Sequence, residues 1–275
     1  MSLFESVLYG LVTGLAEFLP ISSQAHQALL TKLLGIDSVS PVSNLLCHIA
    51  IALALIVACK DALKGLYKEL LLSQRPKRRR SREPIKRSLY DIALIRTAFY
   101  PLAIGFFCYP YTSRILNDIQ WMALFLAING IILFLPPYIR SGNKDSLSMT
   151  RADGVLLGLA AGLGCIPGIS RMAATTTISS IRGADRRHAL HWAFLISIPA
   201  IAFMVGFDVR DVLMQGPGLG GMSGLFFSIL CAGFAYLGAT AAIQIMRFLS
   251  VNTGYSGFSF YCWGAALFMF VLYLL

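Results

Sequence analysis

The chain has 275 residues, of which 57% are hydrophobic and only 13% are charged, and its mean hydropathy is +0.70. Soluble domains are about one-quarter charged, so this composition excludes an ordinary soluble protein and indicates an integral membrane protein. The formal net charge of +10 is concentrated in residues 60–87, where eleven Lys or Arg against three Asp or Glu leave +8. Because this basic run lies beside apolar segments, we expect anionic lipid headgroups as its partner and no nucleic acid.

The apolar segments predict an all-α membrane protein. The first, 3–35, is interrupted at Pro20, and each piece is too short to cross a bilayer core of roughly 30 Å. We therefore expect a re-entrant helical hairpin there and a second one at 153–182. The basic segment 60–88 is predicted to be a cytoplasmic loop. The six predicted transmembrane helices cover 42–59, 89–109, 120–137, 188–206, 223–247 and 255–275.

The two halves of the chain resemble each other. When the sequence is shifted by 148 residues, VLYGL at 7–11 aligns with VLLGL at 155–159. In the same ungapped register, Ile21-Ser22 aligns with Ile169-Ser170. This self-similarity predicts two repeats, 1–137 and 138–275.

Charge predicts that the two repeats are inverted. If the loop 60–88 is cytoplasmic by the positive-inside rule, the first hairpin enters the membrane from outside. The basic linker 138–151 is then also cytoplasmic, so the second hairpin enters from inside. In inverted-repeat proteins of this kind, substrate sites lie near the membrane midplane at the repeat interface.

The first interruption carries polar side chains that are costly at membrane depth and tend to mark function. Glu17, Ser22, Ser23 and His26 lie within ten residues of one another. A serine at 22 or 23 can cap the helix that follows. His26 lies at i+4 from Ser22 and i+3 from Ser23, so a hydroxyl and an imidazole are expected on one helix face.

The second interruption mirrors the first. Gly168 permits a close backbone approach, Ser170 can cap the next helix, and Arg171 begins that helix with Thr175 at i+4. Two helix N-termini that face each other form a site for negative charge, and the planar guanidinium of Arg171 suits phosphate oxygens. The sequence therefore predicts an anion site between the two hairpins.

A purely structural explanation competes for each residue. Serines after a proline are ordinary helix caps, and a single His in an apolar helix usually bonds a neighbouring carbonyl. Arg171 and Glu17 could form an ion pair that only holds the fold together. The occurrence of these polar residues in matched repeat positions favours a functional site, because an ion pair alone leaves the flanking hydroxyls unexplained.

Both motifs resemble those of the bacterial undecaprenyl-diphosphate phosphatases of the bacitracin-resistance type. The matching residues are Glu17-Phe18-Leu19-Pro20-Ile21-Ser22-Ser23 with His26, and Pro167-Gly168-Ile169-Ser170-Arg171 with Thr175. The resemblance covers the whole chain in length, order of spans and repeat. It implies hydrolysis of undecaprenyl diphosphate to the monophosphate, for recycling of the carrier lipid in cell-wall synthesis. The active site would lie toward the outer face of the bacterial cytoplasmic membrane.

The resemblance also implies roles for these residues. Catalysis would involve Glu17, Ser23, His26 and Arg171, and the substrate-binding residues would be Ser22, Gly168, Ser170 and Thr175. Ser23 and His26 would be nucleophile and general base, in an order that the sequence leaves open. Glu17 would help to hold a divalent metal, Mg²⁺ or Ca²⁺, or would transfer protons.

The chain departs from the family pattern near both motifs. The departing residues are Thr13, Gln24, Ala25, Asn44, Met172 and Ala173. Thr13 stands where relatives usually carry a second acidic residue, and its loss is expected to weaken metal binding. Two alternatives therefore stay open: a transporter that flips a polyprenyl phosphate, and a lipid-phosphate binder without hydrolysis. The oligomeric state is also open, with a homodimer among the alternatives.

Overall fold

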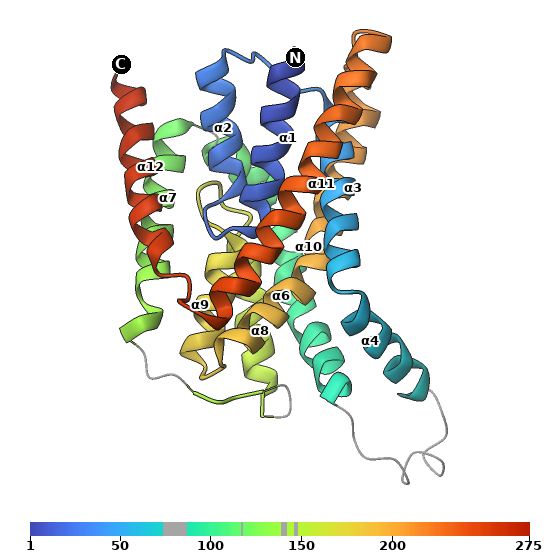
Figure 1. Ribbon diagram of the computed structural model, residues 1–275, viewed down its shortest axis with the longest axis vertical. Helices are drawn as coiled ribbons and strands as arrows, with labels where there is room; N and C mark the ends of the chain where they lie inside the picture. The colour runs from blue at the N-terminus through green and yellow to red at the C-terminus, as the bar shows by residue number, and fades with distance from the viewer. Residues whose placement is uncertain (74–86, 117, 139–141, 146–147) are drawn as a thin grey trace.

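The computed structural model describes residues 1–73, 87–116, 118–138, 142–145 and 148–275. Within these residues the protein is all-helical and contains no β-strand, as predicted (Figure 1). Six of the described helices are long and apolar enough to cross a membrane. They are α3 (Pro41–Ala58), α6 (Arg87–Leu116), α7 (Ile119–Phe134), α10 (Arg186–Gln215), α11 (Met222–Val251) and α12 (Gly257–Leu274). The six predicted spans are thus confirmed, with α10 extending beyond its predicted end at 206.

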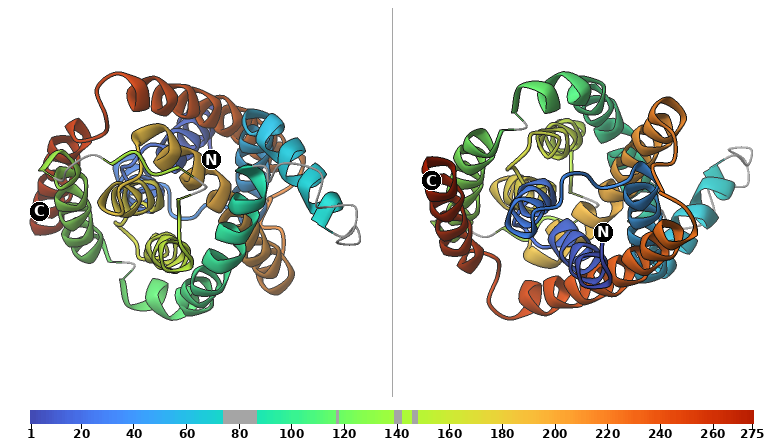
Figure 2. Two further views of the ribbon diagram at one scale, coloured as in Figure 1. Left: turned by 90° about the horizontal axis from the view of Figure 1, so that it is seen from below. Right: turned by 90° about the horizontal axis from the view of Figure 1, so that it is seen from above.

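Two pairs of shorter helices occupy the segments that the sequence marks as interrupted. They are α1 (Leu3–Phe18) with α2 (Ser23–Leu34), and α8 (Arg151–Leu163) with α9 (Arg171–Ile181). The two pairs extend from opposite ends of the bundle (Figure 1) and lie within a ring of longer helices (Figure 2). Their connecting loops meet in the interior, where the Gly168 N–H donates to Ser22 Oγ at 3.2 Å.

The prediction of a loop over 60–88 is wrong for its first half. Lys60–Ser73 forms helix α4, because Leu63, Leu66 and Leu70 recur at helical spacing and give the segment an apolar face. Residues 74–86, which hold most of the basic run, lie outside the described residues. Pro136–Tyr138 forms the short 3-10 helix η1 directly after α7.

Glycines bring α1 against α11. A Cβ atom at Gly10 would lie 2.1 Å from the Cys231 carbonyl oxygen, and one at Gly14 would lie 2.0 Å from the Ala235 carbonyl oxygen. A pair of small residues four apart lets two helix backbones approach this closely in a membrane protein. This contact fixes the helix whose last turn carries Glu17.

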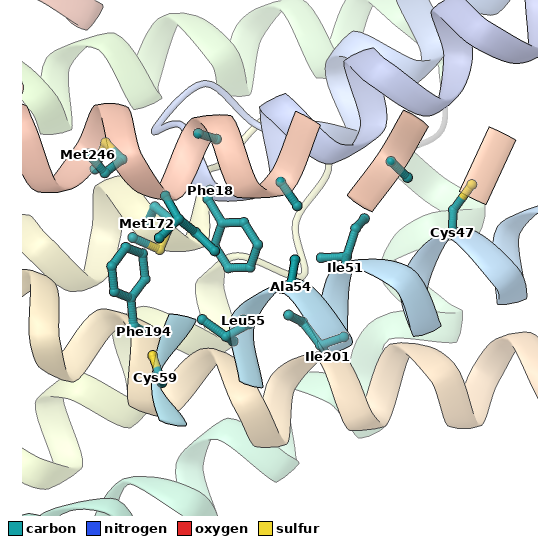
Figure 3. Close-up of a cluster of buried hydrophobic side chains, with 14 of the residues drawn as sticks. Phe18, Cys47, Ile51, Ala54, Leu55, Cys59, Met172, Phe194, Ile201 and Met246 are labelled. Carbon is teal, nitrogen blue, oxygen red and sulfur yellow. The ribbon is translucent and has the colours of Figure 1, made fainter. Parts of the chain in front are cut away.

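A buried apolar cluster joins the ends of the two interrupted pairs to α3, α10 and α11 (Figure 3). The rings of Phe18 and Phe194 meet edge to face, with centroids 6.0 Å apart, and Met172 is fully buried beside them. Phe18 follows Glu17 and Met172 follows Arg171 in the sequence. Burial of the Phe18 and Met172 side chains therefore fixes the backbone next to Glu17 and Arg171.

Charge pairing holds α8 to the end of α9. Asp153 accepts from the Thr150 N–H at 2.8 Å, closes a capping box with Thr150, and is paired with Arg182 and with Lys144. Burial alone would raise the pKa of the Asp153 carboxyl, but these hydrogen bonds and positive charges hold that pKa below its ordinary value. The carboxylate is thus the stable form at the start of α8.

Candidate active site

A cavity of about 170 Å³ lies where the two interrupted pairs face α3, α6 and α10. Five of the eight predicted site residues line it, namely Glu17, Ser22, Ser23, Ser170 and Arg171. The other polar residues around it are Gln24, Gln27, Asn44, His48, Tyr109, Asp208 and Asp211. The two motifs, 154 residues apart at Glu17 and Arg171, are therefore brought together as predicted.

Arg171 and Glu17 form a buried ion pair. The Arg171 Nη2 atom lies 2.5 Å from Glu17 Oε1, and the side chains are 8% and 3% exposed. Arg171 Nε also donates to Ser197 Oγ at 3.2 Å, and Nη1 contacts the Met204 sulfur at 3.8 Å. A guanidinium has five N–H donors, so these contacts with described residues leave two for a ligand in the cavity. The ion pair and a phosphate-binding role are thus compatible.

Ser22 holds an unusual backbone conformation. Its φ of +70° is the only positive value for a non-glycine residue in the described part of the chain. Such conformations cost about 1–3 kcal/mol and tend to gather at functional sites. The prediction that Ser22 or Ser23 caps α2 is wrong, because the helix has no side-chain cap. Ser22 is at the N-cap position, but its Oγ accepts from the Gly168 N–H instead. The N-terminus of α2 therefore faces the cavity without a side-chain cap from Ser22.

The second motif follows its prediction more closely. Ser170 caps α9, accepting from the Ala173 N–H at 3.3 Å, and Arg171 is the first residue of that helix. Gly168 has φ +100°, and a Cβ atom there would lie 2.6 Å from Phe125 Cβ on α7. Only glycine permits this approach without displacing α7.

Three predicted site residues, His26, Gly168 and Thr175, do not line the cavity. The His26 imidazole bonds the Ser22 carbonyl oxygen through Nδ1 at 2.9 Å and the Tyr261 hydroxyl through Nε2 at 2.8 Å. The Thr175 hydroxyl donates to the Arg171 carbonyl oxygen at 2.7 Å. For His26 the structure matches the simpler expectation of a histidine bonded to a neighbouring carbonyl, and neither ring nitrogen bonds the Ser23 hydroxyl.

Sequence reasoning missed Asn129, which joins the two loops. This fully buried residue of α7 donates from Nδ2 to the Pro20 carbonyl oxygen at 2.9 Å and accepts from the Ser170 N–H at 2.9 Å. One amide therefore satisfies a backbone group of each interrupted segment. Its signal was a single asparagine within an otherwise apolar predicted span.

We expect Asn129→Leu to lower the free energy of unfolding by about 2–4 kcal/mol, because two buried backbone groups lose their partner. Thermal unfolding of the purified protein in detergent measures this loss. Asn252→Leu is a matched control, since Asn252 also donates to a backbone carbonyl, at 2.8 Å, but is exposed. Equal melting temperatures for the two variants would contradict a joining role for Asn129.

His48 and Asp208 were also missed as a pair. His48 Nδ1 lies 2.5 Å from Asp208 Oδ2, which connects α3 to α10 beside the cavity. Asp208 lies just past the predicted end of its span at 206, so the sequence did not mark it as a buried charge. Asn44, also on α3, accepts from the Tyr9 hydroxyl at 3.1 Å.

The departures from the family pattern fall into two groups in the structure. Met172 and Ala173 are fully buried in apolar clusters and do not line the cavity. Thr13 is buried behind Gln27, whose amide donates to the Thr13 hydroxyl at 3.3 Å. Of the departing residues, Gln24 and Asn44 do line the cavity. The changes at Met172 and Ala173 therefore place apolar side chains in the core and not in the site.

The residues that line the cavity fit a metal ion that is coordinated partly by a bound ligand. They fit less well a metal ion that is coordinated by protein side chains alone. No group of three or more His, Cys, Asp or Glu gathers as a metal site among the described residues. Glu17 offers a single carboxylate, of which one oxygen accepts from Arg171. Mg²⁺ is commonly held by one or two carboxylates together with substrate phosphates, and this donor set can provide the protein's share.

Comparison with known proteins identifies relatives along the whole chain. Undecaprenyl-diphosphatase of Treponema denticola is 32% identical over 97% of this chain and 100% of its own length. Undecaprenyl-diphosphatase of Alkaliphilus metalliredigens is 31% identical over 96% of both chains, and that of Carboxydothermus hydrogenoformans is 29% identical over 96% and 94%. Residues 6–268, which include both motifs, match the family described as Bacitracin resistance protein BacA. The cavity thus lies in a multi-pass membrane protein that belongs to the bacitracin resistance protein BacA family.

Proposed function

We propose that this protein is a membrane phosphatase that hydrolyses undecaprenyl diphosphate to the monophosphate, which returns the carrier lipid to cell-wall synthesis. The observation that carries the proposal is the meeting of Arg171, Ser23 and the N-termini of α2 and α9 at one cavity. Helix N-termini and a guanidinium both stabilise phosphate charge. Relatives named undecaprenyl-diphosphatase match nearly the full length of the chain, which supports the same substrate here.

We further propose that α1–α2 and α8–α9 are re-entrant hairpins of an inverted repeat, 1–137 and 138–275. Their entry from opposite ends of the bundle supports this (Figure 1). The basic helix α4 follows the C-terminal end of α3, whereas Asn44, in the first turn of α3, lines the cavity. With α4 on the cytoplasmic side and its Lys residues near anionic lipid, the cavity opens toward the outer face of the bacterial cytoplasmic membrane.

Ser23 is the proposed nucleophile. It lines the cavity, and its hydroxyl makes no hydrogen bond with any residue in the described ranges, whereas the Ser22 hydroxyl is occupied by Gly168. The free donors of Arg171 would bind the oxygens of the terminal phosphate. In phosphoryl transfer, positioning and fixed positive charge supply most of the catalysis. Glu17 would hold the guanidinium in place through their 2.5 Å contact.

A divalent metal, Mg²⁺ or Ca²⁺, is proposed to bind between Glu17 and the diphosphate. When bound, the metal would neutralise charge on the phosphate oxygens. Phosphate release should fall when the protein is treated with EDTA and should recover when Mg²⁺ or Ca²⁺ is returned. Release that is unchanged by EDTA would contradict this part of the proposal.

We expect Ser23→Ala to lower phosphate release by more than about 10³-fold, as loss of a catalytic serine does in enzymes with a serine nucleophile. The measurement is phosphate released from undecaprenyl diphosphate by purified protein in detergent with Mg²⁺ or Ca²⁺. Ser6→Ala, which removes a buried hydroxyl at the opposite end of α1, is the matched control and should keep full activity. Absence of release from the wild type would overturn the phosphatase, and a fully active Ser23→Ala would overturn only the nucleophile.

A second cavity favours a transporter as the alternative function. It has a volume of about 600 Å³ and lies at the other end of α9, where Thr176, Thr177 and Ser180 line it together with Arg186 and Arg187. Helix α9 thus has a polar cavity at each end, an arrangement suited to passing a polyprenyl phosphate headgroup between two sides. Movement of the headgroup across sealed vesicles without phosphate release would support the transporter. Lipid binding with neither release nor movement would indicate a binder without hydrolysis.

A further inference from the structure

One histidine beside the cavity has the geometry of an oriented base. The His48 ring lies on α3, its Nδ1 atom is 2.5 Å from Asp208 Oδ2 on α10, and the side chains are 11% and 13% exposed. A carboxylate accepts hydrogen bonds, so the ring proton of neutral His48 resides on Nδ1. The Nε2 atom therefore carries the lone pair that can accept a proton.

That Nε2 atom has no hydrogen-bond partner among the described residues. It is buried and makes no hydrogen bond with any part of the chain that the structure describes. An unpaired buried polar atom costs about 1–3 kcal/mol, and native structures retain such atoms mainly where a water, a ligand or catalysis uses them. Both His48 and Asp208 line the same cavity as Ser23, Arg171 and Glu17. The unused nitrogen thus belongs to the site that holds the proposed nucleophile.

The other histidines differ from His48 in this respect. Both ring nitrogens of His26 are already bonded, to Ser22 and to Tyr261. His188 forms a similar pair with Asp185, with Nδ1 and Oδ2 2.6 Å apart, but Asp185 is the N-cap of α10 and the pair is partly exposed. Neither His188 nor His191 lines the cavity of Ser23. A His–Asp pair alone therefore does not distinguish His48. His48 is distinguished by its position in the cavity and by its Nε2 atom, which has no partner among the described residues.

We propose that His48 is the general base of the phosphatase and that Asp208 is the positioning residue that orients it. This proposal rests on the proposed function. As the Ser23 Oγ atom bonds to the terminal phosphorus, its proton passes to His48 Nε2 and the bridging P–O bond breaks. The polyprenyl monophosphate leaves with that electron pair and takes the proton from Nε2. Water then attacks the phosphoserine and gives a proton to Nε2, inorganic phosphate leaves, and the Ser23 oxygen recovers that proton.

Protonation of Nε2 removes the base, so kcat should fall as the pH decreases. Other groups around the cavity also titrate or carry charge, and a pH profile alone would not identify His48. These groups are Glu17, Tyr109, Cys165, Arg171, Asp208 and Asp211. The decisive observation is therefore whether the acid limb of kcat disappears when His48 is replaced.

The test measures kcat, KM and melting temperature between pH 5 and 8 for wild type, His48→Asn, Asp208→Asn and His188→Asn, with undecaprenyl diphosphate as substrate. The amide of His48→Asn can still donate to Asp208, which preserves the link between α3 and α10 but removes Nε2. We expect kcat of His48→Asn to fall by about 10²–10⁴-fold, with KM and melting temperature nearly unchanged and no acid limb. Asp208→Asn should lower kcat by a smaller factor and keep the acid limb. His188→Asn should match the wild type.

The outcomes separate this proposal from the function on which it rests. No phosphate release from the wild type overturns both. Release from the wild type together with a His48→Asn kcat within about threefold of it overturns the base alone. A slow His48→Asn that retains the acid limb indicates a structural role and also overturns it. If His48→Asn does not fold, a wild-type kcat that is flat from pH 5 to 8, or an unaffected Asp208→Asn, overturns the proposal.

Discussion

Replacement of Arg171 by alanine is expected to reduce phosphate release by about 10³–10⁵-fold, the range seen when a transition-state arginine is lost in phosphoryl transfer. Among the described residues that line the cavity, Arg171 is the only lysine or arginine. Its loss also leaves the Glu17 carboxylate buried without a partner, because the 2.5 Å ion pair is broken. Removal of one partner from a buried pair lowers stability by about 3–5 kcal/mol. The variant should therefore be both inactive and less stable.

A double variant separates the two effects. In Arg171→Ala with Glu17→Gln no buried charge is left unpaired, so the melting temperature should rise above that of Arg171→Ala while activity stays absent. Arg171→Lys keeps a charge but loses the planar fork and the bond to Ser197, and should stay at least tenfold slower. Arg96→Gln, on the exposed face of α6, is the control for loss of an arginine. Full activity in Arg171→Ala would contradict phosphate binding by this residue.

Substitution of Gly14 by alanine should strongly destabilise the protein. The new Cβ would lie 2.0 Å from the Ala235 carbonyl oxygen and 2.8 Å from the Ala239 nitrogen, and both are backbone atoms of α11 that cannot rotate away. Overpacking of this kind costs about 1–3 kcal/mol or more, since one helix must move. Helix α1 also carries Glu17, three residues after Gly14, so phosphate release should decrease as α1 shifts.

Gly264→Ala is the matched control for Gly14→Ala. Gly264 is also helical, in α12, but nothing lies within 4 Å of a Cβ atom built there. Alanine is favoured over glycine in a helix interior by about 0.5–1 kcal/mol, so this variant should melt at or slightly above the wild-type temperature. Melting curves in one detergent compare the two directly. A wild-type melting temperature for Gly14→Ala would show that α1 and α11 do not pack through their backbones.

The amino-acid composition and the order of apolar and polar residues along the chain were enough to predict most of the architecture. Runs of apolar residues must reach the length of the bilayer core, so the six spans could be located, although α10 runs to Gln215, beyond its predicted end at 206. A helix cannot continue unbroken through Pro20, and the first predicted interruption occurs there, between α1 and α2. The second predicted broken segment, 153–182, is interrupted between α8 and α9. Polar residues at those interruptions are costly in an apolar setting, which is why Glu17, Ser23 and Arg171 were expected to meet.

The details of the site depended on contacts between distant segments. Spacing at i+4 placed His26 near Ser22, but it could not predict that Tyr261, far along the chain, would bond the Nε2 atom of His26, which does not line the cavity. Ser22 or Ser23 was expected to cap α2, yet the Ser22 hydroxyl accepts a hydrogen bond from the Gly168 N–H of the other interrupted segment.

The same reason explains the residues that sequence reasoning missed. His48 and Asp208 are 160 residues apart, and Asn129 bonds Pro20 and Ser170 on two different segments. Periodicity reports which side chains share a face of one helix, whereas hydrogen-bond partners are chosen by the packing of several helices. The sequence by itself therefore determined the two opposing motifs and the arginine in the second of them. The positions of His48, the proposed base, and of Asn129, which joins the two loops, were decided by how the helices pack.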